Sequence, residues 1–118
     1  MKITHIVSSL DSNQGGPPNV VLNLADTQKK IGHKVSIISQ FKNLKYNNFK
    51  NLSYINLIKG SFLFKKYYIP NFDFIKKIYN GIKNSEIIHI HGVWNGVVSI
   101  SFLISRFLQK KLFWHLMV

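Results

Sequence analysis

The chain contains no cysteine, which excludes disulfide bonds and thiolate metal sites. It is also poor in acids: 4 Asp and Glu stand against 16 Lys and Arg, a formal net charge of +12. With so few carboxylates, the paired acids of a glycoside hydrolase cannot be argued from this sequence. No Ser/His/Asp set can be argued either, so covalent hydrolysis has no support.

The N-terminus lacks the features of a secretory signal, because Met1 to Val7 has neither a long apolar core nor a small-residue cleavage site. A cytoplasmic location is therefore expected. The most apolar stretch, 93–108, is interrupted by Asn95, Arg106 and three serines. A membrane-spanning helix needs about 20 apolar residues. We expect this stretch to form a core helix of a soluble domain instead.

What the chain does have is enough apolar material for one compact domain. Its 118 residues are 46% hydrophobic and 14% aromatic, too rich in both for a disordered chain. Apolar runs alternate with segments of helical spacing. The expected strands are 3–7, 35–39, 52–58, 86–91 and 112–114, and the expected helices follow Pro17 and Pro18 up to Gly32, and span 72–82 and 96–109.

Alternation of strands and helices predicts an α/β fold with a Rossmann-like open parallel sheet and flanking helices. The two prolines suit the first turn of their helix, Gly32 suits the position after its end, and Asn71 suits an N-cap. Residues 40–51 are expected to form a loop, and 59–70 show no clear period. Because the chain stops as a strand begins, we expect the domain to be incomplete at the C-terminus.

A glycine pair, Gly15 and Gly16, lies between the first strand and the first helix. Ligands of open α/β sheets bind beyond the carboxyl ends of strands, and a helix start attracts phosphate oxygens. The pair alone leaves open both phosphate binding and a simple tight turn. A dinucleotide site is disfavoured, because the G-x-G-x-x-G spacing is missing and no acid follows the second strand.

His89 and His91 are two residues apart on a strand and therefore point to the same face. Such a pair can ligate a metal, but the other histidines are scattered along the sequence and acids are scarce, so no metal site is predicted. His89 is interpreted as a core residue, and His91 as a residue at the carboxyl end, where a ligand would lie. Trp94 is open to two readings, stacking on a sugar ring or capping the core.

Three segments together are similar to a known family: Met1 to Leu10 followed by Gly15-Gly16-Pro17, then Ile31-Gly32-His33-Lys34-Val35, then Ile87 to Trp94. In order and spacing, the chain resembles the N-terminal domain of family-4 retaining glycosyltransferases of the GT-B fold. The resemblance covers nearly the whole chain.

The resemblance implies two Rossmann-like domains facing across a cleft, of which 1–118 is the acceptor-side one. Gly15 and Gly16 would lie near the diphosphate of a nucleotide-sugar donor, and His91, Trp94 and Asn95 would line the acceptor side. The donor is a substrate, so no cofactor is implied. The acceptor would be a glycan or a lipid-linked glycan of capsule, lipopolysaccharide or other polysaccharide synthesis. Such enzymes work at the inner face of the membrane, where a basic surface suits anionic lipid.

The departures from the family are large. The donor domain and its glutamate pair are absent, and His115 stands where relatives have P-H-G but without the proline or the glycine. We therefore expect an N-terminal fragment that is inactive alone, which leaves its status as an enzyme open. The alternative is a standalone basic module for nucleic acid or anionic membrane, since nine lysines lie between Lys42 and Lys83 and aromatics interleave with them. No recognised nucleic-acid motif supports that alternative.

Overall fold

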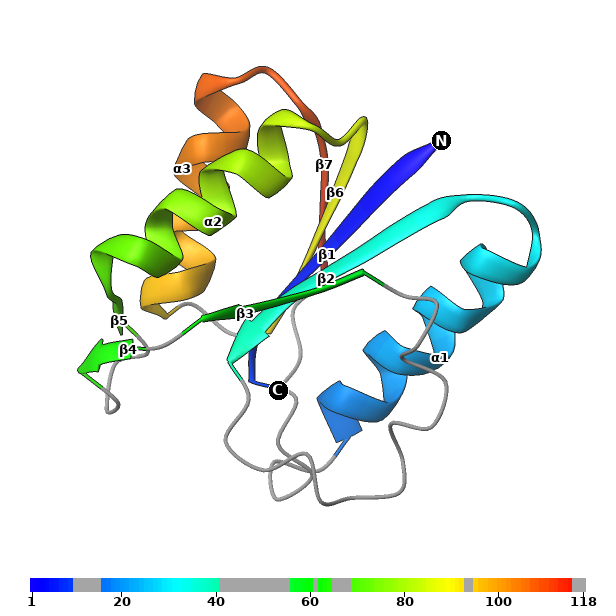
Figure 1. The fold of residues 1–118 in the computed structure, drawn as a ribbon, viewed down its shortest axis with the longest axis horizontal. Helices are drawn as coiled ribbons and strands as arrows, with labels where there is room; N and C mark the ends of the chain where they lie inside the picture. The colour runs from blue at the N-terminus through cyan, green and yellow to red at the C-terminus, as the bar shows by residue number, and fades with distance from the viewer. Residues whose placement is uncertain (10–15, 41–55, 61, 65–68, 93–94, 116–118) are drawn as a thin grey trace.

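The computed structural model describes residues 1–9, 16–40, 56–60, 62–64, 69–92 and 95–115. Five strands form its main sheet: β1 (Lys2–Ser9), β2 (Lys34–Gln40), β3 (Asn56–Gly60), β6 (Ile87–His91) and β7 (Lys111–His115). Their order is β3-β2-β1-β6-β7, and every neighbouring pair is parallel (Figure 1). This confirms the predicted α/β fold with a Rossmann-like open parallel sheet.

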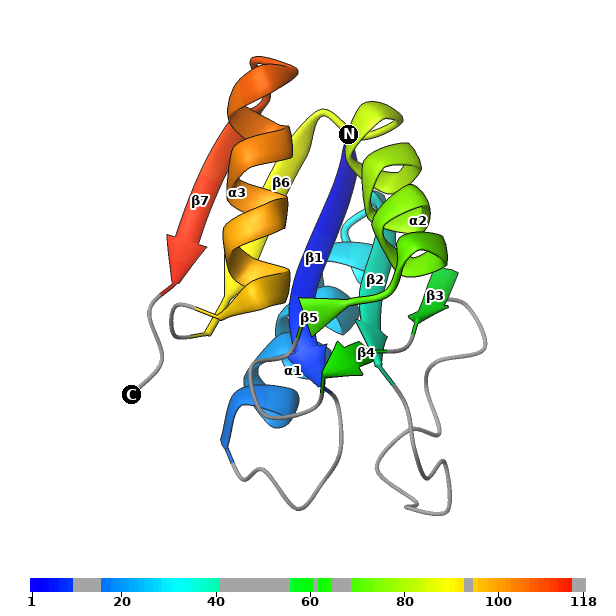
Figure 2. The same cartoon turned by 90° about the vertical axis from the view of Figure 1, so that its left-hand side faces the viewer.

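The helices lie on both faces of the sheet. Helix α1 (Gly16–Lys30) covers one face, and α2 (Phe72–Lys83) and α3 (Gly96–Phe107) cover the other (Figure 2). Their ends follow the expected local chemistry. Gly32 has the left-handed φ of 101° just after α1, and Asn71 Oδ1 accepts a hydrogen bond of 2.8 Å from Phe74 N at the start of α2. Helix α3 ends at 107 rather than at the predicted 109.

Two apolar clusters hold the layers together, one on each face of the sheet. The larger lies between the sheet and α2 and α3, and its buried members are Ile6, Ile38, Phe74, Ile78, Ile82, Ile88, Ile90, Val97 and Val98. The smaller lies under α1 and consists of Val7, Val21, Ala25, Val35 and Ile37. Neighbouring residues of a strand therefore point into different clusters, because successive side chains of a strand lie on opposite faces of the sheet.

Residues 59–70, which show no clear period in the sequence, include a second, small sheet that was not predicted. Strand β4 (Phe62–Phe64) pairs antiparallel with β5 (Ile69–Pro70). Strands of three and two residues are too short to show alternation. The third strand of the main sheet begins at Asn56 among the described residues; 52–55 of the predicted strand, and the predicted loop from 41 onward, lie outside them.

The apolar stretch that raised the question of a membrane span contains α3, which has 12 residues and packs on the core. Within the part of the chain that the structure describes, no helix combines the length and apolar character needed to cross a bilayer.

Candidate functional site

The strand order places the ends of β1 and β6 side by side. Val7 pairs with His91 at the carboxyl end of both strands. From β1 the chain winds to β2 and β3 on one side, and β6 and β7 lie on the other, so β1 and β6 flank the point where the winding reverses. In open α/β sheets, ligands bind at this switch point. The described residues that follow β1 and β6 at this edge, Gly16, Gly92 and Asn95, are thus the candidate site.

Two of the predicted site residues begin the helices at this edge. Gly16 is the first residue of α1, while Gly15 lies outside the described residues. Asn95 is the N-cap of α3, and its Oδ1 accepts a hydrogen bond of 3.0 Å from Val98 N. Trp94 also lies outside the described residues. The start of each helix supplies amide donors suited to phosphate oxygens.

Gly92 separates β6 from this helix start and has a φ of 124°. A side chain at that φ strains the backbone, although a Cβ there would meet only Val98 Cγ2, at 3.9 Å. The backbone conformation directly after β6 therefore favours a glycine at position 92. Its presence after the histidine pair has a conformational cause independent of any ligand.

His91 differs from the expectation for a rim residue. Its side chain is fully buried, whereas His89 keeps partial exposure. The relative burial predicted for the two histidines is therefore wrong. The cause is the neighbouring strand: β1 places His5 against His91, and His91 Nε2 lies 2.9 Å from His5 Nδ1. The role of His91 on the acceptor side stays a prediction.

Three imidazoles meet on the α1 face of the sheet. His5 pairs with His89 across β1 and β6, and one ligand nitrogen from each of His5, His89 and His91 lies within 4.8 Å of the others. The rings of His89 and His91 are stacked with centroids 4.0 Å apart. No metal site was predicted because the other histidines are scattered along the sequence and acids are scarce; the parallel pairing of β1 with β6 removes the first reason for His5. The sequence places these histidines at alternate positions of two predicted strands, but it does not show that the two strands are neighbours.

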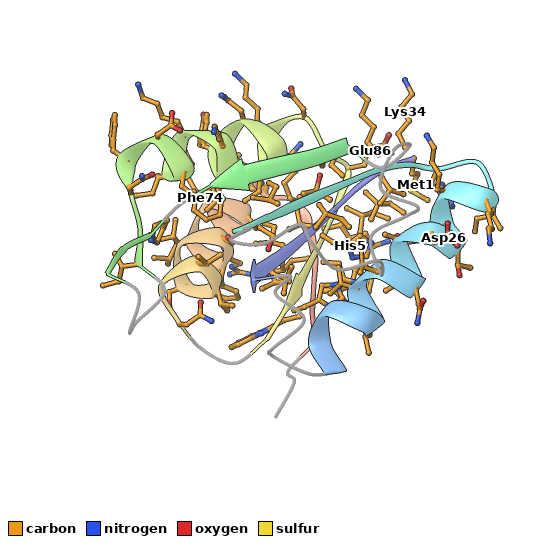
Figure 3. The ribbon with its side chains drawn as sticks, turned by 60° about the horizontal axis from the view of Figure 1, so that its bottom comes forward. Met1, His5, Asp26, Lys34, Phe74 and Glu86 are labelled. Carbon is orange, nitrogen blue, oxygen red and sulfur yellow. The ribbon has the colours of Figure 1, made fainter. Side chains whose placement is uncertain are left out.

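The hydrogen bonds of His5 define its tautomer. Its Nε2 lies 2.6 Å from Gln28 Oε1 on α1, and because an amide oxygen only accepts, Nε2 carries the proton. Nδ1 then accepts from His91 Nε2. Figure 3 shows His5 of β1 on the side of the sheet that α1 covers. Burial lowers the pKa of His5 from 6.5 to about 4, with a further lowering from His89 and an opposing effect from the Gln28 hydrogen bond.

A pocket of about 560 Å³ opens at the opposite, amino-terminal edge of the sheet. Its lining includes Lys2, Lys29, Lys34 and Lys77, with asparagine and serine side chains between them. No carboxylate lines it, although Glu86 lies at the same edge (Figure 3), where its N–H donates to Lys2 O. With four lysines and no carboxylate in its lining, this pocket is basic.

Fold and site together define an α/β protein with a candidate ligand edge at its switch point. Comparisons with protein-family models and with curated proteins find no match. The chain's function must therefore be argued from its own residues.

Proposed function

We propose that this chain is the acceptor-side domain of a GT-B glycosyltransferase, which transfers a sugar from a nucleotide-sugar donor to a glycan or lipid-linked acceptor. One observation carries the proposal: β1 and β6 are parallel neighbours, so the helix start at Gly16 lies at the same edge of the sheet as Gly92 and Asn95. These are the segments that the family resemblance assigns to donor diphosphate and acceptor. In this proposal the chemistry of transfer also requires a donor domain.

The residues at this edge have distinct tasks in the proposal. The first amides of α1 would face the diphosphate, where the helix dipole favours negative charge. Asn95 Oδ1 accepts from Val98 N, and the side-chain NH2 group of Asn95 is the donor that could reach an acceptor hydroxyl. His91, being buried, would support the site from beneath by its hydrogen bond to His5 rather than contact the sugar.

The test is a titration of the ¹⁵N-labelled chain with UDP-glucose and with free UDP, followed by amide chemical shifts. We expect shifts at the start of α1 for both ligands, and additional shifts at Gly92 and Asn95 for the sugar. Amides at the opposite edge, such as Gly32 and Gly81, serve as the control. Shifts at that edge alone, or none at either edge, would contradict the proposal.

A matched pair of variants separates capping from ligand contact. Asn95→Ser keeps a side-chain oxygen for the cap but removes the amide donor, so stability should change little while sugar-induced shifts at the edge decrease. Asn71→Ser makes the same change at the N-cap of α2 and should leave the shifts intact. Equal loss in both variants would mean that Asn95 acts only on helix stability.

A second candidate function, docking on an anionic membrane, is favoured by the basic pocket at the amino-terminal edge. Four lysines line it, of which Lys77 is paired with Asp73 at 3.2 Å. A lysine near an anionic bilayer contributes about 1 kcal/mol to binding. This surface lies at the edge opposite the proposed sugar site, so docking would leave that site accessible.

The prediction for this candidate uses two lysines of the pocket. The double variant Lys2→Gln/Lys34→Gln is expected to bind vesicles containing phosphatidylglycerol roughly 30-fold more weakly than the unchanged chain. Lys76→Gln/Lys111→Gln removes the same charge outside the pocket and is expected to weaken binding clearly less. Vesicle co-sedimentation at fixed salt measures both. Equal losses would indicate general charge attraction, and tighter retention on nucleic acid than on vesicles would point to the other polyanion.

A further inference from the structure

We propose that His5, His89 and His91 form a binding site for one divalent transition-metal ion, with Zn²⁺ as the best fit. The inference goes beyond the proposed sugar transfer and does not depend on it. It rests on the meeting of three imidazoles from two neighbouring strands on one face of the sheet.

The distances suit a shared ion. Zn–N bonds of about 2.0–2.1 Å in a tetrahedral site separate neighbouring nitrogens by about 3.3 Å. His5 Nδ1 and His91 Nε2 are 2.9 Å apart, and no pair in the set exceeds 4.8 Å. Closing the widest of these gaps requires a movement of up to about 1.5 Å. His89 is the ring placed to supply it, because it is the partly exposed member of the cluster, and its stacking on His91 would have to open.

The protonation pattern also suits ligation. Gln28 accepts from His5 Nε2 and so leaves His5 Nδ1 with its lone pair directed at the cluster. This is the supporting contact that fixes the ring and tautomer of metal-bound histidines. When an ion binds, it replaces the hydrogen bond between His91 Nε2 and His5 Nδ1. The proton of His91 moves from Nε2 to Nδ1, so that His91 Nε2 and His5 Nδ1 can both ligate the ion.

The donor set selects the metal. Three neutral imidazoles suit Zn²⁺, Co²⁺, Ni²⁺ and Cu²⁺, and no carboxylate belongs to the cluster among the described residues, which disfavours Mg²⁺ and Ca²⁺. Three histidines leave the fourth position of a tetrahedral ion for water or an anionic ligand. The partly exposed side of His89 is where that ligand would enter.

The test is a calorimetric titration of the untagged chain with Zn²⁺, combined with ¹⁵N spectra of the imidazole rings. We expect one ion per chain and shifts of the ring nitrogens of His5, His89 and His91, with those of His33 unmoved. His33 is the reference because it lies near the N-terminal amine, outside the cluster. No uptake of Zn²⁺, or shifts at His33 without shifts in the cluster, would overturn the proposal.

Variants give the second measurement. His89→Gln removes the partly exposed ligand with the least disturbance of packing and is expected to weaken Zn²⁺ binding at least 10-fold. Gln28 is not a ligand in this proposal, but it orients the ring of His5. Gln28→Leu should therefore weaken Zn²⁺ binding by about 10–100-fold. The matched control His33→Gln should bind as the unchanged chain does. If His33→Gln loses as much affinity as His89→Gln, the cluster is not the site.

Discussion

Replacing Phe74 by alanine is expected to lower the free energy of unfolding by about 3–5 kcal/mol. Phe74 is fully buried in the first turn of α2, within the larger apolar cluster between helices and sheet. Removing the ring leaves a cavity that close-packed neighbours cannot fill. Since domains of this size are stable by only about 5–15 kcal/mol, the loss should be visible as a large shift of the urea midpoint.

The same helix provides a matched control. Phe72 is two residues earlier and 70% exposed, and its ring lies 4.8 Å from Lys76 Nζ. Phe72→Ala is expected to cost about 1 kcal/mol or less, because only an exposed cation–π contact is lost. If both phenylalanines gave similar losses, α2 would not pack on the sheet through the face described here.

The metal-free protein is expected to lose about 3 kcal/mol of stability as the pH falls from 6.5 to 4, through His5 alone. Burial lowers the folded-state pKa of His5 to about 4, whereas the unfolded chain titrates near 6.5. Between these values the unfolded state binds the proton and the folded state does not. The stability that depends on neutral His5 is therefore fully present above pH 6.5 and is lost as the pH falls to about 4. The groups facing His5 are His89 and His91 on β6 and the neutral Gln28 on α1.

Urea unfolding at a series of pH values in the presence of a chelator measures this loss. His5→Asn removes the titrating ring but keeps a polar side chain, so its stability should be lower near pH 7 and should fall less steeply below pH 6.5. The comparison cancels the titration of carboxylates common to both proteins. A profile of equal slope in the variant would show that His5 is not the group responsible.

Much of the fold could be predicted because its elements follow local rules. Gly32 after α1 and Asn71 before α2 mark helix ends through their own backbone and side-chain chemistry. The antiparallel pair β4 and β5 could not be predicted, since strands of three and two residues carry no period. Their pairing depends on tertiary contacts and not on a pattern along the chain.

The candidate site was harder to predict than the fold because it is defined by which strands are neighbours. The pair His89 and His91 was visible, but the third ring comes from β1, and only the strand order brings His5 to it. The burial of His91 has the same origin. A sequence pattern fixes the face of a residue on its own strand, whereas its surroundings depend on the strand beside it.

The central position of β1 has a consequence for how the chain reaches its native state. This strand is synthesised long before its partner β6, whose contacts include that between His5 and His91, 86 residues apart in sequence. The entropy of closing such a long loop is lost before the contacts between β1 and β6 can stabilise the fold. We therefore expect slow folding, during which the edge of β1 that faces β6 is unpaired. During synthesis, β1 therefore stays unpaired on that side until β6 has emerged.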